Sequence, residues 1–237
     1  ADSAPTAIAV MPNGLVWFLE SAAGTLTVLD PSGNGAFTSY AYPQPDAQLG
    51  DIALANNRTV WLTAENRNEI AAFDLATEAF QIEQKSGPAG TPAVDNPFGI
   101  TLDATRQPWM TIRGSVTGQS LIARYAPATT FRVRTTPTGS PDAGPTKIAF
   151  YDAGDFWYLF YAETAVGKAA RLAVLPNGSI GGTVEAELGI DAEPWGVAVD
   201  EDGGAWFAVR GNNTIAGWQP PYSDPNSSYL PLVRTGN

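Results

Sequence analysis

Large hydrophobic residues recur at fixed positions along the chain, each time ahead of a tryptophan. The five tryptophans of this pattern stand 44, 48, 48 and 49 residues apart and are Trp17, Trp61, Trp109, Trp157 and Trp206. The position nine residues before each is Ile or Val, and the position seven before is Val, Leu or Phe. Between them, eight before, stands Ala or Thr. Alternation of bulky and small residues with a period of two predicts a β-strand with close neighbours on both faces.

Each alternating segment leads through a short turn into the tryptophan strand. Asn and Gly are frequent in these turns, as at 12–14 and 202–204, because they adopt the positive φ that tight hairpins need. Two more apolar segments follow before the next repeat, so one unit has the length and strand number of a propeller blade. We therefore predict an all-β, five-bladed β-propeller with four antiparallel strands per blade. An open solenoid or a β-sandwich is the alternative, but a sandwich requires no fixed phase between a tryptophan and three preceding positions.

The repeats predict a single domain spanning 1–237. Its approximate blades are 5–43, 48–88, 96–137, 144–189 and 193–233. Every unit begins with the inner strand and ends with the outer one, so we expect the ring to close by face packing between the first and last blades. The chain begins with Ala1 and contains no stretch near the roughly 18 apolar residues of a membrane span. We expect a secreted, periplasmic or cell-surface protein whose signal peptide has been removed, although a domain cut from a longer chain would look the same.

Composition excludes several kinds of chemistry. The chain has neither Cys nor His, which removes disulfides, thiolate nucleophiles, Ser-His-Asp triads and the commonest zinc ligands. It has 24 acidic and 13 basic residues, a net charge of −11. That charge disfavours nonspecific attraction to nucleic acid or an anionic membrane, so no nucleic-acid partner is predicted.

Two segments carry the repeat in its fullest form, Pro-x-Gly-Ile/Val-x-x-Asp ahead of the tryptophan strand. They are 97–103 and 194–200. These segments resemble the repeats of streptogramin B (virginiamycin B) lyase-like propellers and their NHL-repeat relatives, over nearly the whole chain. For the lyases, the resemblance implies seven blades and a catalytic His acting with a Glu and a magnesium ion. This chain departs from that pattern because it has about five units and no His, and only Glu20 matches the family's Trp-Phe-Thr-Glu motif.

Loops on one face of a propeller gather around its axis and favour ligand binding there. We predict a ligand site on this axial crossover face formed by Glu20, Asp51, Glu65, Phe98, Arg113, Lys147, Tyr161, Trp195 and Arg210. The aromatic rings would supply flat apolar contact, and the cations would bind ligand oxygens. The alternative, that the carboxylates and cations merely pair with one another, stays open.

No catalytic residue, metal ligand or cofactor is assigned. A divalent cation remains an open alternative, because the acidic turn 200–204 has oxygen ligands but lacks EF-hand spacing and falls on the opposite face. We predict a solvated turn there.

The functional hypotheses belong to different classes. The first is a non-catalytic binding or scaffold module outside the cytoplasm, holding a protein, a glycan or another small polar ligand at the cell surface. The alternative is a carboxylate- or metal-dependent lyase or glycosidase-like enzyme working through Glu20, Glu65 and Asp51. A third is a structural component of a larger surface assembly. The lack of a nucleophile-base pair favours the first.

Overall fold

The computed structural model describes most of the chain. The described residues are 3–33, 35–56, 58–84, 95–114, 119–126, 133–189, 191–219 and 232–235. Parts of the predicted blades, at 85–88, 127–132 and 220–231, lie outside the described residues.

The described residues form five antiparallel sheets, each of four strands in sequential order. The first strands are β1 (Pro5–Val10), β5 (Leu49–Ala55), β9 (Asp95–Leu102), β13 (Pro145–Asp152) and β17 (Pro194–Val199). The second strands are β2 (Val16–Glu20), β6 (Thr59–Ala64), β10 (Pro108–Gly114), β14 (Trp157–Glu163) and β18 (Ala205–Val209). The third strands are β3 (Thr25–Leu29), β7 (Glu69–Asp74), β11 (Leu121–Tyr125), β15 (Lys168–Val174) and β19 (Thr214–Trp218). The fourth strands are β4 (Phe37–Ala41), β8 (Ala79–Gln84), β12 (Val133–Pro137), β16 (Ile180–Glu187) and β20 (Leu232–Thr235).

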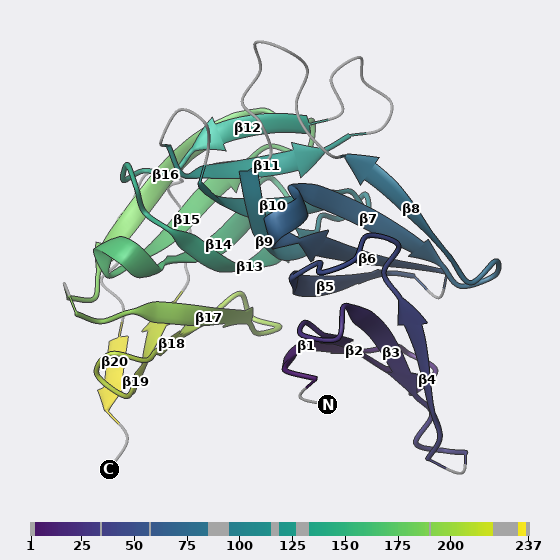
Figure 1. Ribbon diagram of the computed structural model, residues 1–237. Helices are drawn as coiled ribbons and strands as arrows, with labels where there is room; N and C mark the ends of the chain where they lie inside the picture. Colours follow the sequence, from purple (N-terminus) through teal and green to yellow (C-terminus); the bar gives the residue numbers. More distant parts are fainter. Residues whose placement is uncertain are drawn as a thin grey trace.

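These sheets are the blades of a five-bladed β-propeller, which confirms the predicted fold (Figure 1). Helical structure among the described residues is limited to two single 3₁₀ turns, η1 (Glu65–Arg67) and η2 (Thr164–Val166). None of the described segments is a helix of the length and apolarity needed to cross a membrane. The blades are numbered 1 to 5 in chain order below.

The inner strands of successive blades lie side by side, β1 on β5, β5 on β9, β9 on β13 and β13 on β17. The backbones of neighbouring inner strands come closest together where one of them has a glycine. A Cβ built on Gly99 of β9 would lie 2.3 Å from the carbonyl oxygen of Thr146 in β13. Threonine hydroxyls also join neighbouring blades: Thr111 Oγ1 of β10 donates to Thr146 O of β13 at 2.6 Å, and Thr146 Oγ1 donates to Trp195 O of β17 at 2.8 Å. These bonds fix the backbone that carries the residues around the axis.

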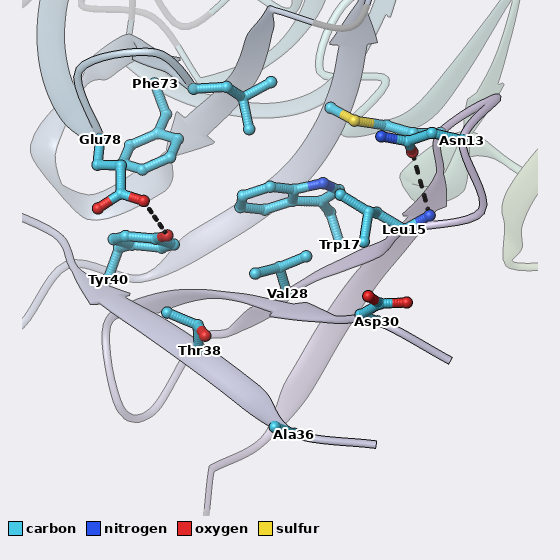
Figure 2. A pocket seen from close by; sticks show the side chains of 12 residues that line it. Asn13, Leu15, Trp17, Val28, Asp30, Ala36, Thr38, Tyr40, Phe73 and Glu78 are labelled. Atoms are coloured by element: carbon cyan, nitrogen blue, oxygen red, sulfur yellow. Dashed lines mark hydrogen bonds between the residues drawn. The ribbon is translucent and has the colours of Figure 1, made fainter. Parts of the chain in front are cut away.

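The repeated tryptophans of blades 1 to 4 pack between blades. Figure 2 shows Trp17 of blade 1 beside Tyr40 and Phe73, and its ring centroid lies 5.9 Å from that of Phe73 in blade 2. Where the repeat has an aspartate six residues before the tryptophan, the indole N–H is satisfied: Trp109 Nε1 donates to Asp103 Oδ2 at 3.0 Å. Blade 1 has Met11 at this position, and Trp17 Nε1 is buried without a hydrogen-bond partner.

The ring differs from the expected closed form. Among the described residues, no packing like that between successive inner strands joins β17 to β1. Figure 1 shows blades 1 and 5 at the two ends of an arc, with the chain termini at those ends. The expectation of closure by packing between the first and last blades was therefore wrong for this structure. Five blades of this curvature do not complete a circle.

Candidate functional site

Two aromatic residues from blades that are not neighbours meet near the axis. Phe98 lies on β9 of blade 3 and Trp195 lies on β17 of blade 5. Their ring centroids are 5.4 Å apart with an interplanar angle of 77°, an edge-to-face contact. Both residues stand in the first half of an inner strand, at the end that faces the axial loops, as the repeat predicted.

Three cations surround this aromatic pair. The guanidinium carbon of Arg113 lies 4.8 Å from the centroid of Phe98 and 5.8 Å from that of Trp195. Arg210 lies over Trp195 at 4.1 Å, and Lys147 Nζ is 5.4 Å from the Phe98 centroid. Cations at these distances are attracted to the faces of aromatic rings. The indole of Trp195 is therefore flanked by two guanidinium groups.

Each cation also has a carboxylate partner. Lys147 Nζ is 2.7 Å from Asp51 Oδ1, across the axis from blade 4 to blade 2. Arg113 donates to Glu65 at 2.9 Å, and Arg210 pairs with Glu193 at 3.3 Å. We call Asp51, Glu65, Phe98, Arg113, Lys147, Glu193, Trp195 and Arg210 the axial cluster.

Asp51 is the most deeply placed carboxyl of the axial cluster. Burial raises the pKa of the Asp51 carboxyl, while the Lys147 ammonium and the backbone N–H of Ile100, 3.1 Å from Oδ2, act in the opposite direction. Because Lys147 and Asp51 are both largely buried, this pair ties opposite blades together and belongs to the framework of the cluster.

The two arginines retain most of their donor capacity. A guanidinium has five N–H donors. Among the described residues, Arg113 uses one terminal nitrogen for Glu65, and Arg210 uses one for Glu193. The remaining donors of both groups flank the same indole and can bind oxygen acceptors of a ligand.

Seven of the nine residues that the sequence placed on the axial crossover face are found in the axial cluster. Sequence reasoning missed Glu193, the Arg210 partner, and the threonines Thr111 and Thr146 that hold the neighbouring backbone. Glu193 immediately precedes the Pro-Trp of the repeat, which was the available signal.

Tyr161 was predicted to face the axis, but it is buried between blades. It lies within β14, opposite Ile148 and Ala170, and packs in a cluster with Trp109 of blade 3. In blade 4 the small residue of the inner strand, Ala149, is opposite Phe160, whereas in blade 1 the corresponding Ala9 is opposite Trp17. β14 therefore extends to Glu163, and position 161 is still inside the strand.

Glu20 also lies apart from the axial cluster. Its Oε2 accepts hydrogen bonds from Thr25 Oγ1 at 3.0 Å and Thr27 Oγ1 at 2.5 Å, all on blade 1. The hydroxyl of Thr27, followed by that of Thr25, lowers the pKa of Glu20. Among the described residues, it shares no hydrogen bond or ion pair with the axial cluster. In the antiparallel register Glu20 is opposite Pro5, and its counterpart in blade 4 is Glu163, opposite Pro145. In blade 1 this side of the strand faces no neighbouring blade.

The acidic turn at 200–204 has a structural explanation. Asp200 Oδ2 accepts the indole N–H of Trp206 at 2.8 Å, and Oδ1 accepts the backbone N–H of Gly204 at 2.7 Å. These bonds lower the pKa of Asp200, and the bond from the Trp206 indole has the largest effect. In the described part of the chain, no group of three or more acidic side chains is arranged to hold a metal ion.

A separate cavity of about 340 Å³ lies between blades 1 and 2 on the side of the hairpin turns. Its wall includes Trp17, Val28, Tyr40, Phe73, Leu75 and Glu78. Figure 2 shows the Tyr40 hydroxyl donating to Glu78 Oε1, at 3.1 Å. No residue predicted for the axial site lines this cavity.

Comparison with known proteins supports the fold. No protein-family model and no curated protein matches the sequence. Among solved structures, virginiamycin B lyase from Staphylococcus aureus matches with a TM-score of 0.77 at 19% identity, over 99% of this chain and 71% of the lyase chain. A chain of the nidogen/laminin complex matches with a TM-score of 0.70 at 15% identity, over 92% of this chain and 76% of that one.

A calcium-binding regucalcin from Agrobacterium tumefaciens matches at 0.63 and 16% identity, covering 96% of this chain and 73% of that one. The predicted resemblance to streptogramin B lyase-like propellers is thus confirmed at the level of the fold. Proteins of different activities share this architecture, so the fold does not decide between a binding protein and an enzyme.

Proposed function

We propose that this propeller is a non-catalytic binding module that holds a glycan on its axial crossover face. The observation that carries the proposal is the arrangement of Arg113 and Arg210 about Trp195, at 5.8 and 4.1 Å from the indole. An indole supplies a flat apolar surface, and guanidinium donors beside it bind hydroxyl oxygens. This combination suits a sugar ring, which has an apolar face and a rim of hydroxyl groups.

Charge favours a neutral sugar over an acidic one. The chain carries a net charge of −11, which repels anions at long range. Within the site, an acidic ligand would compete with Glu65 and Glu193 for the same guanidinium groups. A neutral ligand can use the unoccupied N–H donors and leave both ion pairs intact. A location outside the cytoplasm, where such glycans are displayed, is part of the same proposal, and cell fractionation tests it.

The enzymatic alternative has less support. Glu20, Asp51 and Glu65 were its candidate carboxylates. Glu20 lies apart from the axial cluster, and within the cluster Asp51 and Glu65 each pair with a different cation. Acid and base catalysis by two carboxyl groups requires both to face one substrate bond. The described contacts of these three residues do not bring any two of them together.

Trp195→Ala tests the proposed site. Binding of neutral oligosaccharides on a glycan array is measured for the native protein, and affinity is then determined by calorimetry for those that bind. We expect Trp195→Ala and Arg210→Ala each to reduce affinity about tenfold or more, because stacking and hydrogen-bonding contacts of this kind contribute about 1–2 kcal/mol.

Arg58→Ala is the matched control. Arg58 is an exposed arginine on the hairpin turn between β5 and β6, at the end of the blade away from the axial cluster. Its Nε lies 3.4 Å from Asp74 Oδ2. This variant should bind as the native protein does. Equal binding by native protein and Trp195→Ala would contradict the proposal, and so would an absence of neutral-sugar binding across the array.

A further inference from the structure

The two end blades of the arc each have one large face without a neighbouring blade. Successive inner strands pack from β1 through β17, and the described residues show no such packing between β17 and β1. In Figure 1, the sheet of β1–β4 and the sheet of β17–β20 stand at opposite ends of the arc. The composition of these two faces shows what they are suited to contact.

The free face of blade 1 is apolar over its half toward the hairpin turns, whereas Glu20, Thr25 and Thr27 form a hydrogen-bonded polar group over the other half. Ile8, Val10 and Phe37 are 69%, 63% and 63% exposed. In the antiparallel register, Ile8 is opposite Phe18, and Phe37 is opposite Leu29. Phe18 and Phe37 also touch edge to face, with centroids 6.0 Å apart. Monomeric proteins rarely expose a contiguous apolar surface of this kind without a partner.

The same positions in blade 2 are buried. Ile52 and Leu62 of blade 2 are paired across β5 and β6, as Ile8 and Phe18 are across β1 and β2. Both are buried, together with Phe73, in a cluster that includes Trp17 and Leu19 of blade 1. The free face of blade 1 therefore has the composition of an inter-blade interface and lacks the blade that would cover it.

Blade 5 lacks a neighbour on the other side of the sheet, the side that in blade 1 packs against blade 2. Ile215 is 51% exposed, and Ala198 and Ala208 on the same face are exposed as well. The residue of blade 1 that corresponds to Ile215 is Leu26, and it is completely buried against blade 2. The two ends of the arc thus present complementary halves of the interface that is already repeated between all successive blades.

The size of the gap indicates what fits into it. Five blades, which make up nearly all of this chain, cover 71% of virginiamycin B lyase with a TM-score of 0.77. The uncovered part of that ring corresponds to about two more units of the length seen here. A second copy of this chain would bring five blades to a gap of about two, so it cannot close the ring in one plane.

We propose that the two free faces form one docking surface for a pair of four-stranded blades of the same repeat type, supplied from outside these 237 residues. One added blade covers Ile215 with its bulky aliphatic face. The other packs its tryptophan face on Ile8 and Phe18. The resulting ring encloses the axial cluster on all sides. This inference is independent of the proposed glycan function.

A single introduced cysteine can report on the free face, because the chain has no cysteine of its own. Ile8→Cys is made in the 237-residue chain and in a fusion that carries a second copy of residues 48–137 after Asn237. The rate of labelling by a fluorescent maleimide is measured in each. We expect rapid labelling in the 237-residue chain and labelling at least about tenfold slower in the fusion, because a buried thiol is inaccessible to the reagent.

Two further variants calibrate the rates. Ser32→Cys lies in an exposed turn and should label rapidly in both proteins, whereas Ile52→Cys, at the matched buried position of blade 2, should label slowly in both. If the first fusion fails to unfold cooperatively, the same segment is placed ahead of Ala1.

Two results would overturn the proposal. One is labelling of Ile8→Cys as fast in both fusion orders as in the 237-residue chain. The other is a dimer of the 237-residue chain in sedimentation velocity in which Ile8→Cys is protected, which would identify a second copy as the occupant. A monomer with rapid labelling, together with protection in either fusion, supports the two-blade partner.

Discussion

Glu163, the last residue of β14, is a fully buried carboxyl group next to the carboxyl of Glu185. Burial, followed by the negative charge of Glu185, raises the pKa of Glu163 to about 8. Lys168 sits at the edge of this pair, 2.9 Å from Glu185 Oε2, and partly offsets the repulsion. Near neutral pH the folded protein therefore holds a proton that the unfolded chain releases.

This proton links stability to pH. The pKa of Glu163 is higher in the folded state than its ordinary value of 4.5, so its contribution is most favourable below about pH 4.5 and is lost as pH rises toward 8. We expect the free energy of unfolding to fall between pH 5 and 8 by up to about 1 kcal/mol per pH unit from this group. Glu163→Gln, which keeps the shape without the charge, should flatten that slope in urea titrations.

The exposed Glu187 provides the control for that experiment. Glu187→Gln removes a carboxylate from β16, the strand of Glu185, and should change the slope far less than Glu163→Gln, since that side chain is 74% exposed and its charge is the smallest contribution to the raised pKa of Glu163. Native protein with constant stability from pH 5 to 8 would contradict the assignment.

At the level of elements, the inner strands depend on close backbone contact between neighbouring blades. Gly99 on β9 and Gly50 on β5 both lie where a Cβ would press on the next strand, 2.3 Å from Thr146 O and 3.1 Å from Phe98 O respectively. The threonine hydroxyl bonds run along the same contacts. The spacing of the blades is thus set by glycine and threonine positions near the axial cluster.

Gly99→Ala should be strongly destabilising, because its methyl group would overlap a backbone carbonyl that cannot move without displacing β13. We expect a loss of about 3 kcal/mol or more in the free energy of unfolding, at the upper end of overpacking effects. Gly196→Ala is a suitable comparison, since the nearest atom to its Cβ would be 3.6 Å away. Equal stability losses for the two variants, measured by thermal unfolding, would rule out the proposed role of the close contact.

For the whole molecule, stability is distributed along the arc, since the sheets pack face to face with their neighbours in sequence and non-neighbouring blades meet through side chains of the axial cluster. Blades 2, 3 and 4 are packed on both faces, whereas blades 1 and 5 are packed on one. In such repeat architectures, stability is approximately a sum of unit and nearest-neighbour terms. Packing between blades therefore stabilises each end blade by about half as much free energy as it stabilises a central blade.

Hydrogen exchange should reveal this gradient. We expect the backbone amides of β2 and β18 to exchange about tenfold faster or more than those of β10 and β14, because opening an end blade breaks one interface and opening a central blade breaks two. Mass spectrometry of peptic fragments measures the rates. Uniform protection across the five tryptophan strands would indicate that the arc unfolds as one cooperative unit.

The sequence by itself determined the blades, because the period-two alternation and the phase of the tryptophans are local consequences of packing a strand between two neighbours. It also placed Phe98, Trp195, Arg113 and Arg210 at strand ends on one face, since their distance from each tryptophan follows from strand length. It failed at Tyr161 because Phe160, not Trp157, takes the tryptophan position in the register of blade 4, so counting from Trp157 places the strand end three residues too early.

Only the tertiary structure decided the curvature of the arc and the pairing across its axis. The angle between successive blades depends on side-chain volumes summed over whole interfaces, so no single repeat reveals whether five of them close a ring. The ion pair between Lys147 and Asp51 joins residues from blades 4 and 2, and the partners of the remaining cations likewise depend on which loop ends meet. Local patterns set the strands, whereas long-range packing set the site and left two faces open.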